Sequence, residues 1–333
     1  MNFNNLNYHN LIISILILLA AGYIYDKFKL KVELDDKTEE LNIIKKYLLN
    51  EKDYSTIERL SSINKPILWI HLDYQKNSRK WLSFGSRNTN ELNQDYLYLT
   101  IRSIINKCSD DFHIVLIDDD CFDKLLDKWN IDINKISDPQ KEYFRKLGLV
   151  KTLHKYGGIL LEPSFILFKS LKPIYDKVLS TQKMCVAEFP NKSSNSHIMF
   201  YMPNMSFIGC VKNCPKMREF QNHLEILLSK DYTNEINMED LINKWLFTNT
   251  QNNNINYIDG TYIGVKDSKN KMIQIEDLIG STFLELDSKS YALYIPHKEL
   301  LTRTNYNWFA YLSVEQVLTS STNIGKYLLL SNS

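Results

Sequence analysis

Short apolar runs and amphipathic stretches alternate along residues 65–175, which is the hydropathy pattern of an α/β domain. The runs Pro66–Asp73 (PILWIHLD) and Phe112–Ile117 (FHIVLI) are continuously apolar, so they predict buried strands. Between them, Asp95–Cys108 places leucine and isoleucine residues at helical spacing, which predicts an amphipathic helix. The alternation of strand and helix favours a sheet covered by helices.

A second helix and a glycine pair follow these elements. The segment Pro139–Tyr156 has a helical pattern and begins after Asp138, a capping residue followed by a first-turn proline. The helix is expected to end at Gly157 and Gly158, because glycine accepts the left-handed conformation that terminates helices. The next residues predict a strand, a break at Pro163 and a second strand, since proline cannot donate to a sheet ladder.

The N-terminal region contains an uncharged apolar run from Leu11 to Tyr25. We expect residues 1–31 to form a retained membrane anchor, although a cleaved signal peptide is the alternative. Basic residues follow the run and none precedes it, which predicts that the large domain faces the cytosol. Residues 32–64 are charged and carry heptad-like apolar positions, so they are interpreted as a helical stalk.

Composition narrows the classes of function. The chain has 333 residues, 44% of them hydrophobic, and a formal net charge of +1, so it can bury a full core and has no global field for nucleic acid. Asparagine is frequent, which indicates an AT-rich genome of the kind found among large DNA viruses. The five cysteines are scattered and are expected to be free thiols, with a zinc site at Cys210 and Cys214 as the weaker alternative.

Three aspartates, Asp118, Asp119 and Asp120, follow the second predicted strand. Asp118 and Asp119 stand at its carboxyl end, where ligands bind in open α/β sheets. An aspartate before a helical segment is also a good N-cap, so capping and ligand binding both remain open for these residues.

Residues 155–165 (KYGGILLEPSF) resemble a motif of the nucleotide-sugar transferases of the DXD sugar-binding and capsular polysaccharide synthesis type, and of fungal initiating mannosyltransferases. In those families a helix ending in tyrosine and two glycines leads into a short strand with an Asp-x-Asp motif. The resemblance covers roughly residues 65–175. It implies a GT-A-like fold, a Rossmann-type and mostly parallel sheet flanked by helices, and transfer with retention of configuration.

The resemblance also implies donor-binding residues. In the families the acidic motif holds Mn²⁺ or Mg²⁺ against the donor diphosphate, and the matching positions here are Glu162 and Ser164. One carboxylate is therefore missing, so metal binding at Glu162 is expected to be weakened, or Asp118 or Asp119 completes the site. The preceding Gly157 and Gly158 belong to the same motif.

Basic side chains on the preceding helix are the alternative to a metal. Arg145 and Lys151 are candidates, and their six-residue spacing places them on different faces of the helix. The families carry an acid and an arginine where this chain has Lys146 and Leu149. The pair Glu142 and Arg145 has the family spacing one turn earlier, and a solvated helix face is the other interpretation.

The second half of the chain, residues 176–333, is expected to bind the acceptor. Cys185–Phe189 and Asn204–Asn213 predict strands. Near the C-terminus, His297 and Trp308 lie in a segment that combines aromatic and polar residues, which suits a sugar face, although aromatic clusters are more often core. Residues 65–175 would then form the nucleotide-sugar half of one domain, residues 65–333.

The leading hypothesis is a membrane-anchored glycosyltransferase. It would move a sugar from a nucleotide-diphosphate sugar to a glycan, lipid or protein acceptor, without a nucleic acid partner. The alternative is a catalytically inactive chain of the same fold that acts as a binding or structural membrane protein, because fold does not fix function. A hydrolase is disfavoured, since neither a GxSxG elbow nor a paired-histidine metal motif occurs.

Overall fold

The computed structural model describes residues 65–73, 94–192, 199–230 and 238–332, with residues 47 and 196 and a few residues between 18 and 25. The chain divides into two compact units, Met1–Lys46 and Tyr47–Ser333. All elements named below belong to the second unit.

The predicted N-terminal transmembrane helix is corrected by the structure. Among the described residues, no helix is long and apolar enough to cross a membrane. Residues 11–17 of the predicted span, and nearly all of the predicted stalk 32–64, lie outside the described residues. An uncharged run of 15 residues is also shorter than the roughly 20 residues that a bilayer core requires. The predicted transmembrane helix, and the single-pass localisation that depended on it, are therefore wrong.

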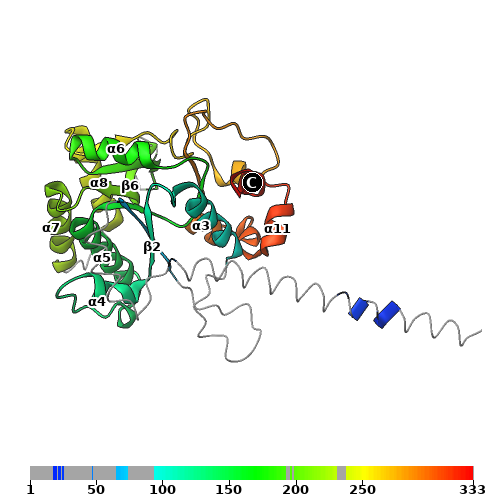
Figure 1. Cartoon of the computed structure of the whole chain (residues 1–333), viewed down its shortest axis with the longest axis horizontal. Coiled ribbons are helices and arrows are strands. Elements are labelled where there is room, and N and C mark those ends of the chain that lie inside the picture. The colour runs from blue at the N-terminus through cyan, green and yellow to red at the C-terminus, as the bar shows by residue number, and fades with distance from the viewer. Residues whose placement is uncertain are drawn as a thin grey trace, which may run out of the picture. The chain divides into compact units, whose positions relative to one another are not determined.

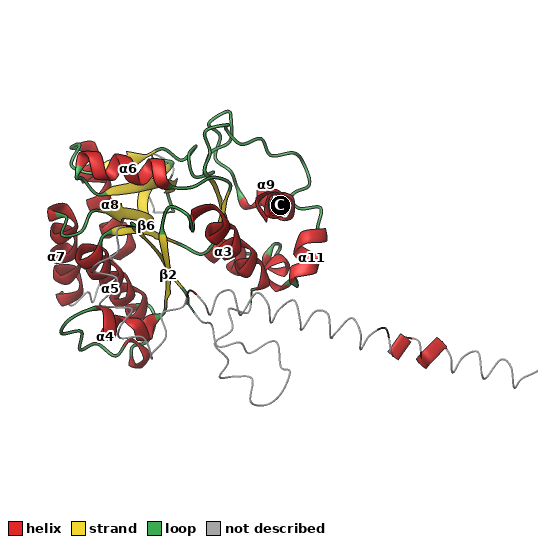
Figure 2. Ribbon diagram, viewed as in Figure 1, coloured by secondary structure: helices red, strands yellow, loops and turns green. Residues whose placement is uncertain are grey.

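A six-stranded sheet forms the centre of the second unit, in the order β2-β1-β3-β6-β5-β7 (Figure 2). Its strands are β1 (Ile67–His71), β2 (His113–Ile117), β3 (Gly158–Leu161), β5 (Cys185–Pro190), β6 (Tyr201–Cys210) and β7 (Asn256–Ile258). β1 is parallel to β2 and to β3, and β5 is parallel to β7, whereas β6 is antiparallel to both of its neighbours. The predicted α/β class with a mostly parallel sheet is confirmed for the described residues.

Helices cover this sheet. Figure 1 shows α4, α5 and α7 gathered on one side of the sheet and α3 with α11 on the other. The helices are α3 (Asp95–Cys108), α4 (Phe122–Leu125), α5 (Gln140–Tyr156), α6 (Lys172–Thr181), α7 (Pro215–Ser229), α8 (Met238–Gln251), α9 (Ile275–Ile279), α10 (His297–Thr302), α11 (Val314–Thr319) and α12 (Asn323–Asn332). Short 3-10 turns occupy Asp119–Cys121 (η2), Ile133–Lys135 (η3) and Asn307–Tyr311 (η4).

The predicted break at Pro163 is confirmed, and it moves the chain from one sheet to another. β3 ends at Leu161, and β4 (Phe165–Leu167) pairs with β8 (Ala292–Tyr294) in a separate two-stranded sheet. The main chain at the break is fixed by a bond from Thr100 Oγ1 to the Pro163 carbonyl at 2.6 Å. Glu162 therefore lies where the central sheet ends and the chain turns towards the C-terminal elements.

The glycine pair lies at the opposite end of β3, where the backbone needs positive φ angles and passes close to β1. Gly157 and Gly158 have φ values of 73° and 106°, which the backbone of residues other than glycine rarely adopts. A Cβ on Gly158 would lie 2.1 Å from the Ile67 carbonyl oxygen. The indole of Trp69 donates to the Gly157 carbonyl at 2.9 Å, inside the core. These glycines allow α5 to end and β3 to enter the sheet directly beside β1.

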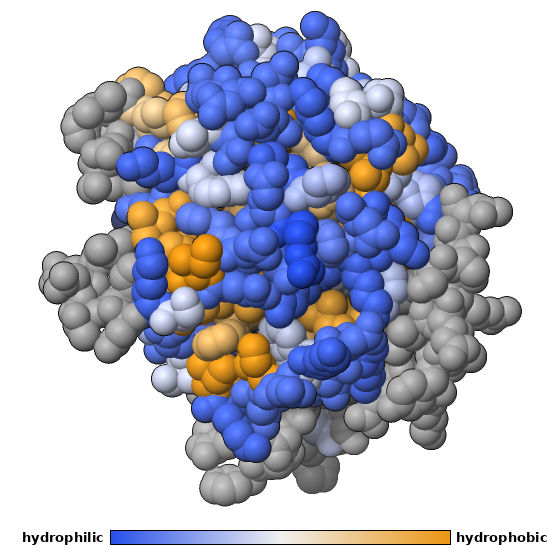
Figure 3. Space-filling model, turned by 90° about the vertical axis from the view of Figure 1, so that its left-hand side faces the viewer, coloured by the Kyte–Doolittle hydropathy of each residue, from blue (hydrophilic) through white to orange (hydrophobic). Residues whose placement is uncertain are grey.

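The core lies between the sheet and its helices. The central strands bury nearly every side chain, as expected of strands covered on both faces. α5 packs on α7, and α8 packs on β6. On the face of Figure 3, hydrophobic residues lie in separate patches on a largely hydrophilic surface, which is common for folded chains.

Candidate functional site

Three parallel strands deliver polar residues to one edge of the sheet. β1 ends at His71, β2 ends at Ile117 and β3 ends at Leu161. Because these strands are parallel, the residues that follow them meet at the same edge. Those residues include Asp119 and Glu162, both of which the sequence singles out.

We call the polar side chains gathered at this edge the carboxyl-edge cluster. Their contacts and charge interactions link them into one group, to which α3, α5, β6, α8, β8 and α10 also contribute. The members are His71, Asp73, Tyr96, Asp119, Lys141, Glu142, Arg145, Lys146, Glu162, Ser206, Glu239, Tyr294, His297 and Lys298.

Glu162 is half-buried at the end of β3 and is held by Ser206 of β6. Its main-chain N–H donates to the Ser206 carbonyl at 3.0 Å, and the Ser206 hydroxyl donates to Oε1 at 2.8 Å. Burial raises the pKa of Glu162, while the Ser206 hydrogen bond and the charges of Lys298 and Lys146 oppose this shift. The fold thus keeps a partly desolvated carboxylate that interacts electrostatically with two ammonium groups.

Two tyrosines flank this carboxylate. Burial and then the Glu162 charge raise the pKa of both Tyr96 and Tyr294 well above the usual value. The Tyr96 hydroxyl forms a short hydrogen bond with His297 Nδ1. Burial lowers the pKa of His297 to about 4, so its imidazole is neutral at pH 7.

The two lysines beside Glu162 are shared with other carboxylates. Lys146 pairs with Glu239 of α8 and lies 3.6 Å from Glu142 on its own helix. Lys298, at the start of α10, pairs with Glu142. Desolvation would lower the pKa of Lys298, but the charge and hydrogen bond of Glu142 together with the charges of Glu162 and Glu239 outweigh it and raise that pKa. Helices far apart in sequence are therefore tied together around Glu162.

Asp119 is engaged by a second set of partners. Arg145 donates to its two carboxylate oxygens at 2.7 Å each, and His71 lies at 3.0 Å. The same guanidinium donates to Asp73 at 3.0 and 3.1 Å. Burial would raise the pKa of Asp119, but hydrogen bonds from Arg145 and His71 outweigh it and hold that pKa well below its usual range. This bidentate pair is a rigid part of the edge.

Asp118 and Lys151 have structural partners. The Asp118 side chain accepts from the Asp120 N–H at 3.1 Å and caps η2, so the capping interpretation is confirmed for this residue. Lys151 pairs with Glu225 of α7 at 3.0 Å. Arg145 reaches the carboxyl edge while Lys151 does not, which confirms that they occupy different faces of α5.

Other candidates lie at varied distances from Glu162. Gly157 and Gly158 stand at the amino end of β3, the opposite end from Glu162. Ser164 is buried just beyond Glu162, and its hydroxyl has no hydrogen-bond partner among the described residues. Trp308 is 45% exposed on η4 and contacts Phe309. Of the residues predicted from the sequence, the carboxyl edge therefore brings together Glu162, Asp119, Arg145 and His297. Ser164 lies two positions after Glu162 in the chain.

The structure adds residues that sequence reasoning did not assign to the site. These are His71, Tyr96, Ser206 and Tyr294, together with Lys146 and Lys298 in the role of neighbours to Glu162. His71 could have been found, because it ends a predicted strand parallel to the one before Asp119. No local sequence pattern indicated the contribution of α10, because Lys298 and Glu142 are 156 positions apart.

A protein-only metal site is absent from the described residues. No group of three or more histidine, cysteine, aspartate or glutamate side chains is placed to hold a metal ion in that part of the chain. All five cysteines are free and buried, so the alternative of a zinc site at Cys210 and Cys214 has no support. Any hard cation at the edge would need ligands from a bound substrate.

Comparisons with known proteins give little further information. No known protein family and no curated protein matches the sequence. The chain is similar to a solved structure described as PaToxG Glycosyltransferase, at 14% identity and a TM-score of 0.33, over 66% of this chain and 80% of that one. At this TM-score the likeness defines neither the fold nor the function, so the site itself must indicate the chemistry.

Proposed function

We propose that this chain is a glycosyltransferase that moves a sugar from a nucleotide-diphosphate sugar to an acceptor hydroxyl. The observation that carries the proposal is Glu162, a half-buried carboxylate at the carboxyl end of β3, between two tyrosines and two lysines. Ligands of open α/β sheets bind at such edges. The sequence resemblance of residues 155–165 to donor-binding motifs supports the same assignment.

Charge balance at the edge indicates how a diphosphate would be accepted. Among the described members of the carboxyl-edge cluster, five carboxylates face four basic side chains, leaving a net charge of −1 before His71 is counted. A free diphosphate would be repelled by this balance. A divalent cation bound to the diphosphate removes the repulsion, so we propose that the donor arrives with Mg²⁺ or Mn²⁺.

The residues present fit a cation of that kind. Mg²⁺ commonly binds through one or two carboxylates plus substrate phosphates and waters, and it takes oxygen ligands. Glu162 supplies one carboxylate, and the unpartnered Ser164 hydroxyl supplies a neutral oxygen two residues later. When bound, the cation would neutralise charge on the departing nucleoside diphosphate. The ligand role of Asp119 is not proposed, because Arg145 and His71 occupy both of its oxygens.

The remaining groups of the cluster have distinct proposed roles. Lys298 has a side chain that is 71% exposed, so it can exchange Glu142 for a phosphate oxygen. In the transfer, the acceptor oxygen bonds to the anomeric carbon and the carbon–oxygen bond to the diphosphate breaks. The electron pair stays on the nucleoside diphosphate, which takes up the acceptor proton. The pair Arg145 and Asp119 holds the strand ends in place during these changes.

A non-catalytic binding protein of the same fold is the second candidate. The observation that favours it is the internal pairing of Arg145, Lys146 and Lys298 with carboxylates. In the described part of the chain, each of these three cations already has a carboxylate partner. The two candidates differ in turnover, because only an active transferase releases nucleoside diphosphate from a donor.

The Glu162→Gln variant tests the proposal. Gln keeps the shape of the side chain and removes its charge, so nucleotide release from donor sugars in the presence of Mn²⁺ should fall about 10²-fold or more. Because burial penalises the charged form of Glu162, the free energy of unfolding of the variant should be equal to or greater than that of the wild type. The control is Glu225→Gln on α7, which should leave release unchanged. Wild-type rates in Glu162→Gln would contradict the proposal.

A further inference from the structure

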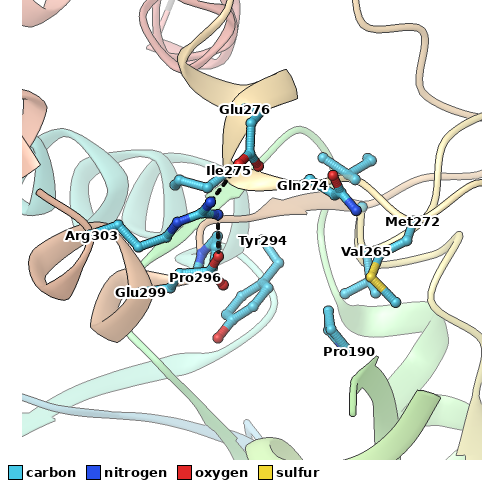
Figure 4. Close-up of a pocket in the computed structure, with 12 residues that line it drawn as sticks. Pro190, Val265, Met272, Gln274, Ile275, Glu276, Tyr294, Pro296, Glu299 and Arg303 are labelled. Carbon is cyan, nitrogen blue, oxygen red and sulfur yellow. Dashed lines mark hydrogen bonds and ion pairs between the residues drawn. The ribbon is translucent and has the colours of Figure 1, made fainter. Parts of the chain in front are cut away.

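A pocket lies beside Tyr294 (Figure 4). It has a volume of about 280 Å³, close to the lower end of the roughly 300–1,000 Å³ typical of ligand pockets. The end of β5, the loop before α9, the end of β8 and α10 form its walls. A pocket of this size holds a small ligand, such as one sugar ring.

The polar wall of the pocket is an ion-pair array. Arg303 of α10 lies 2.7 Å from Glu276 and 2.9 Å from Glu299. Lys192, which lies outside the lining, is 3.3 Å from Glu299. The lining itself has two carboxylates and one guanidinium, so its net charge is negative and disfavours an anionic ligand. It offers carboxylate oxygens that accept hydrogen bonds and guanidinium N–H groups that donate them, which is the complement of a row of hydroxyl groups.

The opposite wall is apolar. Figure 4 shows the Tyr294 ring in the middle of the lining, with Glu276, Arg303 and Glu299 on one side and Val265, Met272 and Pro190 on the other. One polar wall and one apolar wall suit a pyranose ring, which presents hydroxyl groups at its edge and C–H groups on its faces.

The pocket is connected to Glu162 through the pairing of β4 with β8. Tyr294 lines the pocket and pairs with Phe165, three residues after Glu162. After burial, the charge of Glu162 also raises the pKa of Tyr294. A ligand in the pocket therefore lies next to the position where the proposed function places the donor.

We infer that this pocket binds the terminal sugar ring of a neutral glycan, which is the acceptor. The inference rests on the proposed function for the reaction, whereas glycan binding itself can be measured without turnover. Among glycan, lipid and protein acceptors, a polar wall rich in hydrogen-bond acceptors that disfavours anionic groups favours the neutral glycan. Arg303 is the specificity-determining residue, because it bridges both carboxylates and orients them towards the bound hydroxyl groups.

The test compares Arg303→Met with wild type in two assays. Met retains the length of the side chain and removes its hydrogen-bond donors. Calorimetry with a panel of neutral oligosaccharides should show binding to the wild type that is weakened about tenfold or more in the variant, corresponding to about 1.4 kcal/mol. Transfer to the bound glycan should show a raised acceptor KM, while nucleotide release in the absence of acceptor stays at the wild-type rate.

The control is Arg218→Met, an exposed arginine on α7 outside the pocket, which should change neither assay. A second variant, Met272→Trp, fills the pocket without altering its charges and should also weaken glycan binding. The inference would be overturned if no neutral glycan binds the wild type. It would also be overturned if Arg303→Met and Met272→Trp bind glycan as tightly as the wild type does. Glycan binding that persists without any nucleotide release would support the pocket and contradict only the proposed reaction.

Discussion

Replacing Asp119 by Asn removes the charge at the centre of the buried ion-pair group while keeping the shape of the side chain. Arg145 holds Asp119 through two bonds of 2.7 Å, and the two side chains are only 12% and 13% exposed. Breaking a buried pair costs about 3–5 kcal/mol, because the remaining charge loses its partner. Arg145 retains Asp73, which is itself 54% exposed, so we expect the lower end, about 3 kcal/mol.

Acidification should reduce the difference in free energy of unfolding between the wild type and Asp119→Asn. The pKa of Asp119 is held well below its usual value, so its contribution to stability is present above the unfolded pKa of about 3.9. It is lost only as the pH falls through the lower folded pKa. The wild type and Asp119→Asn should therefore differ by a constant amount from pH 5 to pH 8 and converge at lower pH.

Urea denaturation at pH 7.5, 5 and 3 measures both features. The expected loss corresponds to a decrease in melting temperature of roughly 6–12 °C for a domain of this size. The double variant Asp119→Asn with Arg145→Met should lose less than the sum of the single losses, because both remove one interaction. Equal stability of Asp119→Asn and wild type at pH 7.5, or a difference that grows on acidification, would refute the reasoning.

Two further predictions concern backbone and hydrogen bonding. Gly158→Ala should destabilise the chain by more than about 3 kcal/mol in urea denaturation, because its Cβ would overlap the Ile67 carbonyl at a φ of 106°. Gly148→Ala is compared with it: the new Cβ would lie 2.9 Å from the buried Phe122 ring, so this side chain must shift and a smaller loss than for Gly158→Ala is expected. Tyr96→Phe removes the hydroxyl that is hydrogen-bonded with His297 and should cost about 1–2 kcal/mol, and an unchanged melting temperature would contradict a stabilising role for that hydrogen bond.

Local sequence patterns were sufficient to predict the first half of the fold. The runs at Pro66–Asp73 and Phe112–Ile117 contain β1 and β2, and the break at Pro163 separates β3 from β4. These elements depend on hydrophobic periodicity and on proline chemistry, which act over a few residues. The position of Glu162 at a strand end followed from the same local information.

Contacts between distant segments were not predictable from the sequence alone. The pairing of Arg145 with Asp119 and Asp73, and of Lys298 with Glu142, depends on the arrangement of helices around the sheet. Spacing on α5 could only show that Arg145 and Lys151 face different ways.

The central claim, that the carboxyl edge binds a nucleotide-diphosphate sugar, is tested most directly by thermal stabilisation with a panel of donor sugars. A donor at 100 times its Kd stabilises a folded chain by about 2.7 kcal/mol, which corresponds to roughly 5–11 °C here. We expect at least one donor to give this shift in the presence of Mn²⁺, with a much smaller shift in Glu162→Gln. No shift with any donor, with or without Mn²⁺, would contradict the claim.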